Sequence, residues 1–534
     1  MTQPKRPHIL LLFTDQQRYD TIAAAGYPFM QTPHLDRLCR EGCRFTHAYS
    51  PNPVCVPARH NLLTGLPASV HGYAHNWRHP LDWRIPTLPK ILSDHGYDTR
   101  AIGKMHFRPV RAHHGFHRME LMEETFDRRE DDDYALYLAA RGYGHIQNLH
   151  GVRNHLYMLP QRSPLPEELH GSTWVADRCI EFLRSNRGQR PFFLFASWIH
   201  PHPPFAVSDS VADLYRETPL PLPITAETPL TPRTAAANLA SILPRDNTAC
   251  LRRIRELYFA AITQVDRNIG RVLAELESLG ELDNTLIFFT SDHGEMLGDH
   301  GACDKAQPYD SAARIPFLLR FPSKLAPGSV DERFIDLNDI LPTVLDAVGI
   351  GYPGERALPG SSLLRMDSGR DRTLQYVEHD FGERRWISLR DKRHKYVYHY
   401  GGGITQLFDL EHDPGERVNL LHDGGNAEAR DIQRRLHPLL AEYEQRWGPQ
   451  GYVIDGKLAT MRTPEFQGGY SKQFPLWPSN LPGASSKEID VQFTRETLAA
   501  VGKEPTSRLC ELDLAAWERN GAPDELIRTL RDTR

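Results

Sequence analysis

The 534-residue sequence lacks long apolar runs and has few cysteines. Its longest early apolar run, Ile9 to Phe13, is far shorter than the roughly 20 residues of a transmembrane helix. Thr14 and Asp15 follow this run without the small-residue cleavage site of a signal peptide, so we predict a cytoplasmic protein with no membrane contact. The seven cysteines are an odd number spread thinly along the chain, which favours reduced thiols over a disulfide framework.

The sequence also has no excess of one charge. It contains 63 Lys and Arg residues against 68 Asp and Glu residues, giving a net charge of −5. Such a balance argues against binding to nucleic acid or to an anionic membrane surface. What the sequence does contain is histidine, with 26 residues, more than twice the number expected by chance. This excess directs attention to metal or acid–base chemistry.

Strand-length apolar segments alternate with amphipathic helical segments through about the first 350 residues. Such alternation predicts an α/β fold in which helices cover both faces of a sheet. We expect a large domain over residues 1–371. Its clearest strands are expected at residues 7–13, 99–103, 191–197 and 286–290, and its clearest helices at 32–42, 55–65, 87–96, 251–279 and from the capping pair Ser172-Thr173 onward.

Two segments interrupt this alternation. Residues 107–170 contain the acidic run Glu123 to Asp133, and residues 217–247 are rich in Pro and Thr. We expect both to be long excursions outside the core, and we interpret the acidic run as a solvated surface.

The pattern changes near residue 372. Short apolar segments at 374–378, 386–390, 395–400 and 405–410, followed by a helical segment at 427–447, predict a small antiparallel sheet with one helix over residues 372–447. Residues 448–534 form a tail with Trp477 and Trp517, too aromatic for plain disorder and too irregular for a domain core.

Polar residues follow four of the expected strands at their carboxyl ends. These pairs are Asp15-Gln16, Lys104/His106, His200/His202 and Asp292-His293. Open α/β sheets place ligands at this edge, so we expect the four pairs to converge on one site.

A fifth element begins at Cys55. Pro57 in the first turn and Gly65 as the stop predict a helix with Cys55 at its N-terminus. Free N–H groups there favour an anion, so Cys55 suits a thiolate of lowered pKa or a nucleophile that meets a charged ester. A buried structural thiol is the alternative interpretation.

These residues resemble a known family, the type I sulfatases. The resemblance covers about residues 8–420 and is specific for the superfamily rather than for a substrate. It is carried by Cys55-x-Pro57-x-Arg59 with Leu62-Leu63-Thr64-Gly65, and by Thr32-Pro33-His34-Leu35-Asp36, Gly103-Lys104-Met105-His106, Pro201-His202-Pro203-Pro204-Phe205, Ser291-Asp292-His293-Gly294-Glu295 and Leu407-Phe408-Asp409-Leu410 with Asp413-Pro414.

The resemblance implies an alkaline-phosphatase-like fold, built on a large mixed, mostly parallel sheet, and a nucleophile made by converting Cys55 to formylglycine. A formylglycine-generating enzyme would be the maturation partner. Arg59 and Lys104 would fix the nucleophile and the anion, and His106 would take a proton from residue 55. The resemblance further implies that His202, or less readily His200, acts with Lys305 on the leaving oxygen, and that Asn76 contacts the substrate anion; a surface ion pair and a turn residue are the alternatives for Lys305 and Asn76.

The metal ligands implied by the resemblance are Asp15, Gln16, Asp292, His293 and residue 55. Many sulfatases that bind Ca²⁺ through oxygen atoms have Asp-Asp and Asp-Asn where this sequence has Asp15-Gln16 and Asp292-His293. The amide of Gln16 and the imidazole of His293 reduce the negative charge of the metal site. This ligand set favours Mn²⁺, and Ca²⁺ remains the alternative. This pattern resembles the branch that holds choline sulfatases and phosphonate monoester hydrolases, in which C-terminal tails join subunits, so we expect a homo-oligomer, a dimer or tetramer.

Three functions remain in competition. The first is hydrolysis of sulfate monoesters, with a small anionic ester as substrate. The second is hydrolysis of phosphonate monoesters or phosphodiesters on the same residues, because both kinds of tetrahedral group make similar demands on cations and nucleophile. The third is a catalytically inactive binding protein with an unmodified Cys55, against which the full set of Lys104, His106, His202 and Lys305 argues.

Overall fold

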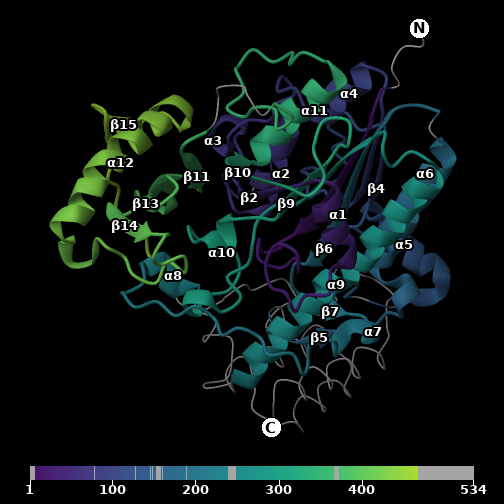
Figure 1. The fold of residues 1–534 in the computed structure, drawn as a ribbon, viewed down its shortest axis with the longest axis horizontal. Coiled ribbons are helices and arrows are strands. Elements are labelled where there is room, and N and C mark those ends of the chain that lie inside the picture. Colours follow the sequence, from purple (N-terminus) through teal and green to yellow (C-terminus); the bar gives the residue numbers. More distant parts are fainter. Residues whose placement is uncertain are drawn as a thin grey trace.

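The computed structural model describes residues 6–466 except 77–78, 127, 145, 147, 152–157, 159, 188, 238–247 and 366–371. Its centre is one large twisted sheet with helices on both faces (Figure 1). The sheet is parallel except at β9, which runs antiparallel to both of its neighbours. Its order is β10 (Ser329–Asp336), β2 (Cys43–Tyr49), β9 (Phe317–Arg320), β8 (Thr285–Ser291), β1 (His8–Asp15), β6 (Phe192–Pro201), β3 (Asp98–Gly103) and β4 (Arg118–Leu121).

Each central strand presents alternate residues to opposite faces, as the period of two in a strand requires. In β1, Leu10 and Leu12 belong to one buried cluster, whereas Ile9, Leu11 and Phe13 belong to the other. The strand is therefore apolar on both faces, which is why it forms one continuous hydrophobic run in the sequence. This finding confirms the fold class predicted from the sequence.

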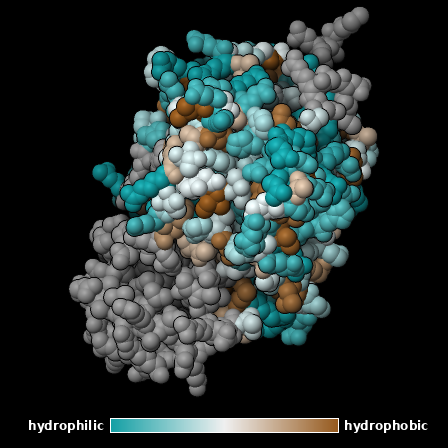
Figure 2. All heavy atoms as spheres, turned by 90° about the vertical axis from the view of Figure 1, so that its left-hand side faces the viewer, coloured by the Kyte–Doolittle hydropathy of each residue, from teal (hydrophilic) through white to brown (hydrophobic). Residues whose placement is uncertain are grey.

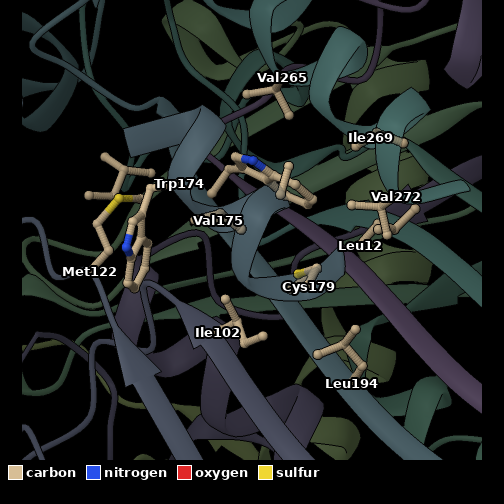
Figure 3. Packing of buried hydrophobic residues seen from close by; sticks show 14 of the residues in the cluster. Leu12, Ile102, Met122, Trp174, Val175, Cys179, Leu194, Val265, Ile269 and Val272 are labelled. Carbon is tan, nitrogen blue, oxygen red and sulfur yellow. The ribbon is translucent and has the colours of Figure 1, made fainter. Parts of the chain in front are cut away.

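Two sets of helices cover the two faces. The first set consists of α1 (Pro33–Glu41), α5 (Asp133–Leu138), α6 (Gly171–Asn186) and α9 (Thr248–Ser278). Figure 3 shows how Val175 and Cys179 of α6 and Ile269 of α9 pack over Leu12 and Leu194 of the sheet. The second set consists of α2 (Cys55–Thr64), α4 (Leu88–Asp94) and α11 (Ile340–Val348).

Helix α6 begins at Gly171, before the capping pair Ser172-Thr173. His170 is the N-cap, and its Nδ1 accepts a hydrogen bond from the backbone N–H of Ser172 at 3.1 Å. Ser172 therefore lies inside the helix, and the cap preference of Ser over His misplaced the boundary.

The acidic excursion is partly core, in contrast to the expectation of a solvated surface. Tyr134 and Leu138 of α5 are fully buried in the same cluster as α6 and α9. Glu123 and Asp132 are buried as well, at 2% and 0% exposure. Asp132 accepts hydrogen bonds from the backbone N–H groups of Glu123 and Ala135, which offsets the loss of hydration. The remaining short elements of the large domain are α3 (Ala68–His71), β5 (Gln161–Arg162), β7 (Ala206–Val207), α7 (Asp209–Ala212), α8 (Pro232–Ala236) and α10 (Asp310–Ala313).

A smaller antiparallel sheet follows the large domain and lies to its left in Figure 1. Its strands are β11 (Gln375–His379), β12 (Trp386–Arg390), β13 (His394–His399) and β14 (Ile404–Asp409), and α12 (Ala427–Trp447) packs on it. The short hairpin of β15 (Val453–Ile454) and β16 (Lys457–Leu458) joins the same hydrophobic cluster. Residues 448–466 thus extend this unit, whereas Trp477 and Trp517 lie outside the described residues.

The face drawn in Figure 2 is mainly hydrophilic, with hydrophobic residues scattered in small groups. Among the described residues, no helix combines the length and apolar character needed to cross a membrane. None of the six cysteines among these residues forms a disulfide.

Candidate active site

Four neighbouring strands bring their carboxyl ends to one edge of the sheet. Strand β1 pairs with β6 and β8, and β3 pairs with β6, all in parallel. In this register Phe13 and Gly103 both lie beside Ser197, and Thr14 lies beside Ser291. The residues that follow these positions therefore lie at one edge of the sheet, as expected for parallel strands.

Cys55 reaches this edge at the first turn of α2. The helix begins after Val54, which is extended, and ends at Gly65, whose left-handed φ of 68° suits glycine. All ten residues of α2 are buried. The side-chain oxygen of Asn76 accepts the backbone N–H of Val56 at 3.0 Å, so Asn76 lies beside Cys55 at the helix N-terminus.

Cys55 belongs to a compact group of four possible metal ligands. One ligand atom from each of Asp15, Cys55, Asp292 and His293 lies within 4.8 Å of the others, and all four residues are buried. The Sγ atom of Cys55 is 3.2 Å from Nε2 of His293 and 3.8 Å from Oδ1 of Asp15. Two buried carboxylates beside an imidazole are a donor set that fits a divalent cation.

Two cationic side chains form ion pairs with these carboxylates. Arg59, on the same helix as Cys55, donates to Asp15 at 3.0 Å and to Asp292 at 3.3 Å. The Nζ of Lys104 is 2.6 Å from Oδ2 of Asp15, the same oxygen that Arg59 contacts. Burial alone would raise the pKa of Asp15, but Lys104, His202 and Arg59 hold it well below its usual value. Burial and the charge of Asp15 raise the pKa of Asp292 to about 7.

The same environment argues against a reactive thiolate at position 55, which was one interpretation of its helix position. Burial, followed by the charge of Asp15, raises the pKa of Cys55 to about 12. The unmodified thiol therefore stays protonated at neutral pH, because a helix N-terminus does not offset burial beside two carboxylates.

His202 and Lys305 lie together at the other end of the site. Lys305 follows the short 3₁₀ turn η6 (Asp299–Gly301), and its Nζ is 2.9 Å from Nε2 of His202 and 2.6 Å from Oε1 of Gln16. The amide nitrogen of Gln16 donates to the carboxylate of Glu295. Gln16 therefore connects the expected metal site with the pair of His202 and Lys305.

The sequence did not indicate that Glu124 would lie here. Its Oε2 atom is 2.6 Å from Nζ of Lys104 and 3.4 Å from Nε2 of His202. The neighbouring Glu123 accepts the backbone N–H groups of Met105 and His106, each at 2.9 Å. The only available signal was the pair of carboxylates at the start of the acidic run, which we had interpreted as a solvated surface.

The two remaining histidines differ in their surroundings. His106 is buried, its Nδ1 atom has no hydrogen-bond partner among the described residues, and burial and Lys104 lower its pKa. It is therefore a neutral imidazole able to accept a proton. His200 instead packs 5.0 Å from the ring of His170 and lies 3.5 Å from Oγ of Ser172, at the start of α6. These contacts direct His200 toward α6, apart from the pair of His202 and Lys305.

The sequence of this chain was compared with those of known families. Residues 7–350 match the sulfatase family. The chain belongs to the sulfatase family. Residues 298–446 also match the C-terminal region of N-sulphoglucosamine sulphohydrolase. The protein is therefore a sulfuric ester hydrolase of the alkaline phosphatase superfamily, as the motifs around Cys55 and Asp292 indicated.

Individual relatives agree with this placement. An arylsulfatase of Clostridium perfringens is 32% identical over 475 residues, which cover 85% of this chain and 97% of the relative. A choline-sulfatase of Rhizobium meliloti is 28% identical, covering 78% and 82%. The crystal structure of a phosphonate monoester hydrolase of Agrobacterium radiobacter superimposes with a TM-score of 0.69 at 25% identity, covering 86% of this chain and all 100% of that one.

Proposed function

We propose that this protein hydrolyses sulfate monoesters by means of formylglycine at residue 55 and one divalent metal ion. The observation that carries the proposal is the meeting of Cys55 with Asp15, Asp292 and His293 in one buried cluster. Cleavage of a tetrahedral anion also requires cations and acid–base groups, and both lie beside this cluster.

Asp15, Asp292, His293 and the side chain of residue 55 would hold the metal, with the amide oxygen of Gln16 as a further ligand. The ligand atoms of the first four residues are within 4.8 Å of one another and buried, which fits a single ion. A bound divalent cation would polarise the nucleophile and stabilise negative charge on the ester. Carboxylate, amide and imidazole donors together favour Mn²⁺, with Ca²⁺ as the alternative.

Formylglycine would supply a hydrated aldehyde with two hydroxyl groups, one to attack the ester and one to expel the product. The raised pKa of Cys55 supports a modified residue, since the thiol itself would stay protonated. Maturation would need a formylglycine-generating enzyme as a partner. His106 Nδ1, buried and neutral, is the proposed acceptor for the proton that residue 55 releases.

The leaving oxygen would meet His202 and Lys305. The Nδ1 atom of His202 lies 2.6 Å from the carbonyl oxygen of Pro203, which fixes the ring with Nε2 facing Lys305. A proton from Lys305 can therefore reach the leaving oxygen directly or through Nε2 of His202. Asn76, beside residue 55, would contact the anion. The contacts of His200 favour assigning it to packing rather than to substrate.

The second candidate is hydrolysis of phosphonate monoesters or phosphodiesters. It is favoured by the structural likeness to the phosphonate monoester hydrolase, which spans that whole chain. Parallel measurement of kcat/KM for an aryl sulfate, a phenyl phosphonate monoester and a phosphate diester tests the ranking. We expect the sulfate to give the highest value, and a higher value for the phosphonate would reverse the assignment.

Two further properties are part of the proposal. Cysteines without disulfides among the described residues fit the reducing cytoplasm. The C-terminal tail, residues 448–534, would join the subunits of a homo-oligomer, a dimer or tetramer, and size-exclusion chromatography with light scattering measures the subunit number.

A further inference from the structure

The further inference concerns Glu124 and rests on the proposed function. Its carboxylate lies inside a site whose task is to bind an anion. Oε2 is 2.6 Å from Nζ of Lys104 and 3.4 Å from Nε2 of His202, while these two side chains are 0% and 1% exposed. The side chain of Glu124 itself is only 10% exposed. It therefore acts in a poorly hydrated environment, where charges interact strongly.

Backbone hydrogen bonds hold the segment that carries Glu124. The N–H of Met122 donates to the carbonyl of Gly103 at 3.2 Å, which continues the pairing of β4 with β3. The carboxylate of Glu123 then binds the N–H groups of Met105 and His106. The segment after β4 is thus tied to the segment after β3 on both sides of Lys104. This arrangement places the side chain of Glu124 against Lys104. Its inward position is therefore fixed by the backbone of the segment.

Lys104 is shared between two carboxylates. Its Nζ is 2.6 Å from Asp15 at the metal end and 2.6 Å from Glu124 at the opposite end. Burial opposes its positive charge, and Asp15 and Glu124 raise its pKa. Its positive charge is therefore already balanced by two carboxylates before an ester binds.

This balance discriminates between anions of different charge. A sulfate monoester carries one negative charge, whereas a phosphate monoester carries close to two at neutral pH because its second pKa is about 6. The second charge would face Glu124 across a site of low dielectric constant, and such like-charge contacts cost one or more factors of ten in affinity.

We propose that Glu124 is a specificity-determining residue that excludes dianionic phosphate monoesters and admits singly charged esters. The class admitted comprises sulfate monoesters together with phosphonate monoesters and phosphodiesters, which are also monoanions. Glu124 acts through its charge, so an amide of the same shape should lose the discrimination while keeping the hydrogen bond to Lys104.

The test uses the full chain with residue 55 matured and two substrates that share one leaving group, p-nitrophenyl sulfate and p-nitrophenyl phosphate. For Glu124→Gln, the ratio of kcat/KM for the phosphate to kcat/KM for the sulfate should rise at least about tenfold at pH 7.5. The matched control is Glu130→Gln, which removes the same charge from the exposed part of the same excursion and should leave the ratio unchanged.

A second measurement needs no variant. In the wild type the same ratio should rise as the pH falls from 7.5 to 5, because the phosphate ester then becomes a monoanion while the sulfate ester does not change. In Glu124→Gln this rise should be weaker. Comparison within one enzyme cancels effects of pH on the protein that both substrates share.

Two results would overturn the inference. The first is an unchanged ratio in Glu124→Gln; if both esters gain equally, this result shows a carboxylate that merely competes with the anion. The second is a pH-independent ratio in the wild type, and it decides the matter if the variant does not fold. Wild-type protein that cleaves no sulfate, phosphonate or diester would instead overturn the proposed function, so the two failures are distinguishable.

Discussion

The two ends of the candidate site are built by different means. At the metal end, Asp15 ends β1, and Asp292 and His293 directly follow β8, two adjacent parallel strands. At the leaving-group end, Glu124 and Lys305 come from loops and meet His202 only through side-chain contacts. The backbone register therefore fixes the first end, whereas hydrogen bonds and ion pairs between distant segments fix the second. We expect substitutions at the first end to abolish function and those at the second to change rate and selectivity.

The largest effect should follow from Asp292→Asn. Loss of one buried carboxylate from the metal cluster should remove most of the bound divalent ion and lower kcat/KM by at least about 10³-fold. Elemental analysis of the purified protein measures the metal, and initial rates with an aryl sulfate measure the activity. Full metal content in the variant would contradict the ligand set.

A smaller effect is expected for His202→Ala, which should keep its metal. Its kcat/KM should fall about 10²-fold for an aryl sulfate with a poor leaving group and much less for p-nitrophenyl sulfate, whose oxygen needs little protonation. His200→Ala is the matched control, and its kcat/KM per folded protein should stay within about threefold of the wild type. Equal losses with both leaving groups would contradict the role of His202 in proton transfer.

The smallest effect concerns the stability of the fold. It comes from three histidines that pack together, namely His60 of α2 with His71 and His114. Burial lowers the pKa of all three, to about 3 for His71 and about 4 for His114. The unfolded chain binds these protons near pH 6.5, and the folded chain does not. The free energy of unfolding therefore decreases as the pH falls from about 6.5 toward 4, by up to about 1.4 kcal/mol per pH unit for each imidazole.

Urea denaturation at pH 7.5, 6.5 and 5.5 measures this dependence. His71→Gln should reduce the slope of unfolding free energy against pH by about one proton, since it removes one of the three buried bases. An unchanged slope in this variant would show that folding does not lower the pKa of His71.

The meeting of Asp15, Asp292 and His293 could be predicted from the sequence because each of them follows a run that is apolar on both faces of a strand. The hydrophobic runs before Asp15 and Asp292 located the strands, and parallel strands must end at the same edge. The helix after Cys55 was equally clear, since Pro57 and Gly65 mark its limits. The small sheet and α12 were also located within a few residues by their alternation and periodicity.

The leaving-group end could not be predicted to the same depth. The acidic run gave no sign that Glu123 and Glu124 turn inward, because their burial depends on the N–H groups of residues 105–106 and on Lys104. The sequence ranked His202 above His200 only through the family resemblance, since the directions of the two side chains depend on how the chain leaves β6. Whether a charged residue is exposed or buried depends on its contacts with residues far away in the sequence.

The central claim is that residue 55 attacks the ester as formylglycine within the metal cluster. Mass spectrometry of the peptide containing residue 55, from fully active protein isolated from its native host, tests it most directly. We predict an aldehyde in place of the thiol in nearly every active chain. An intact Cys55 thiol in fully active protein would contradict the account.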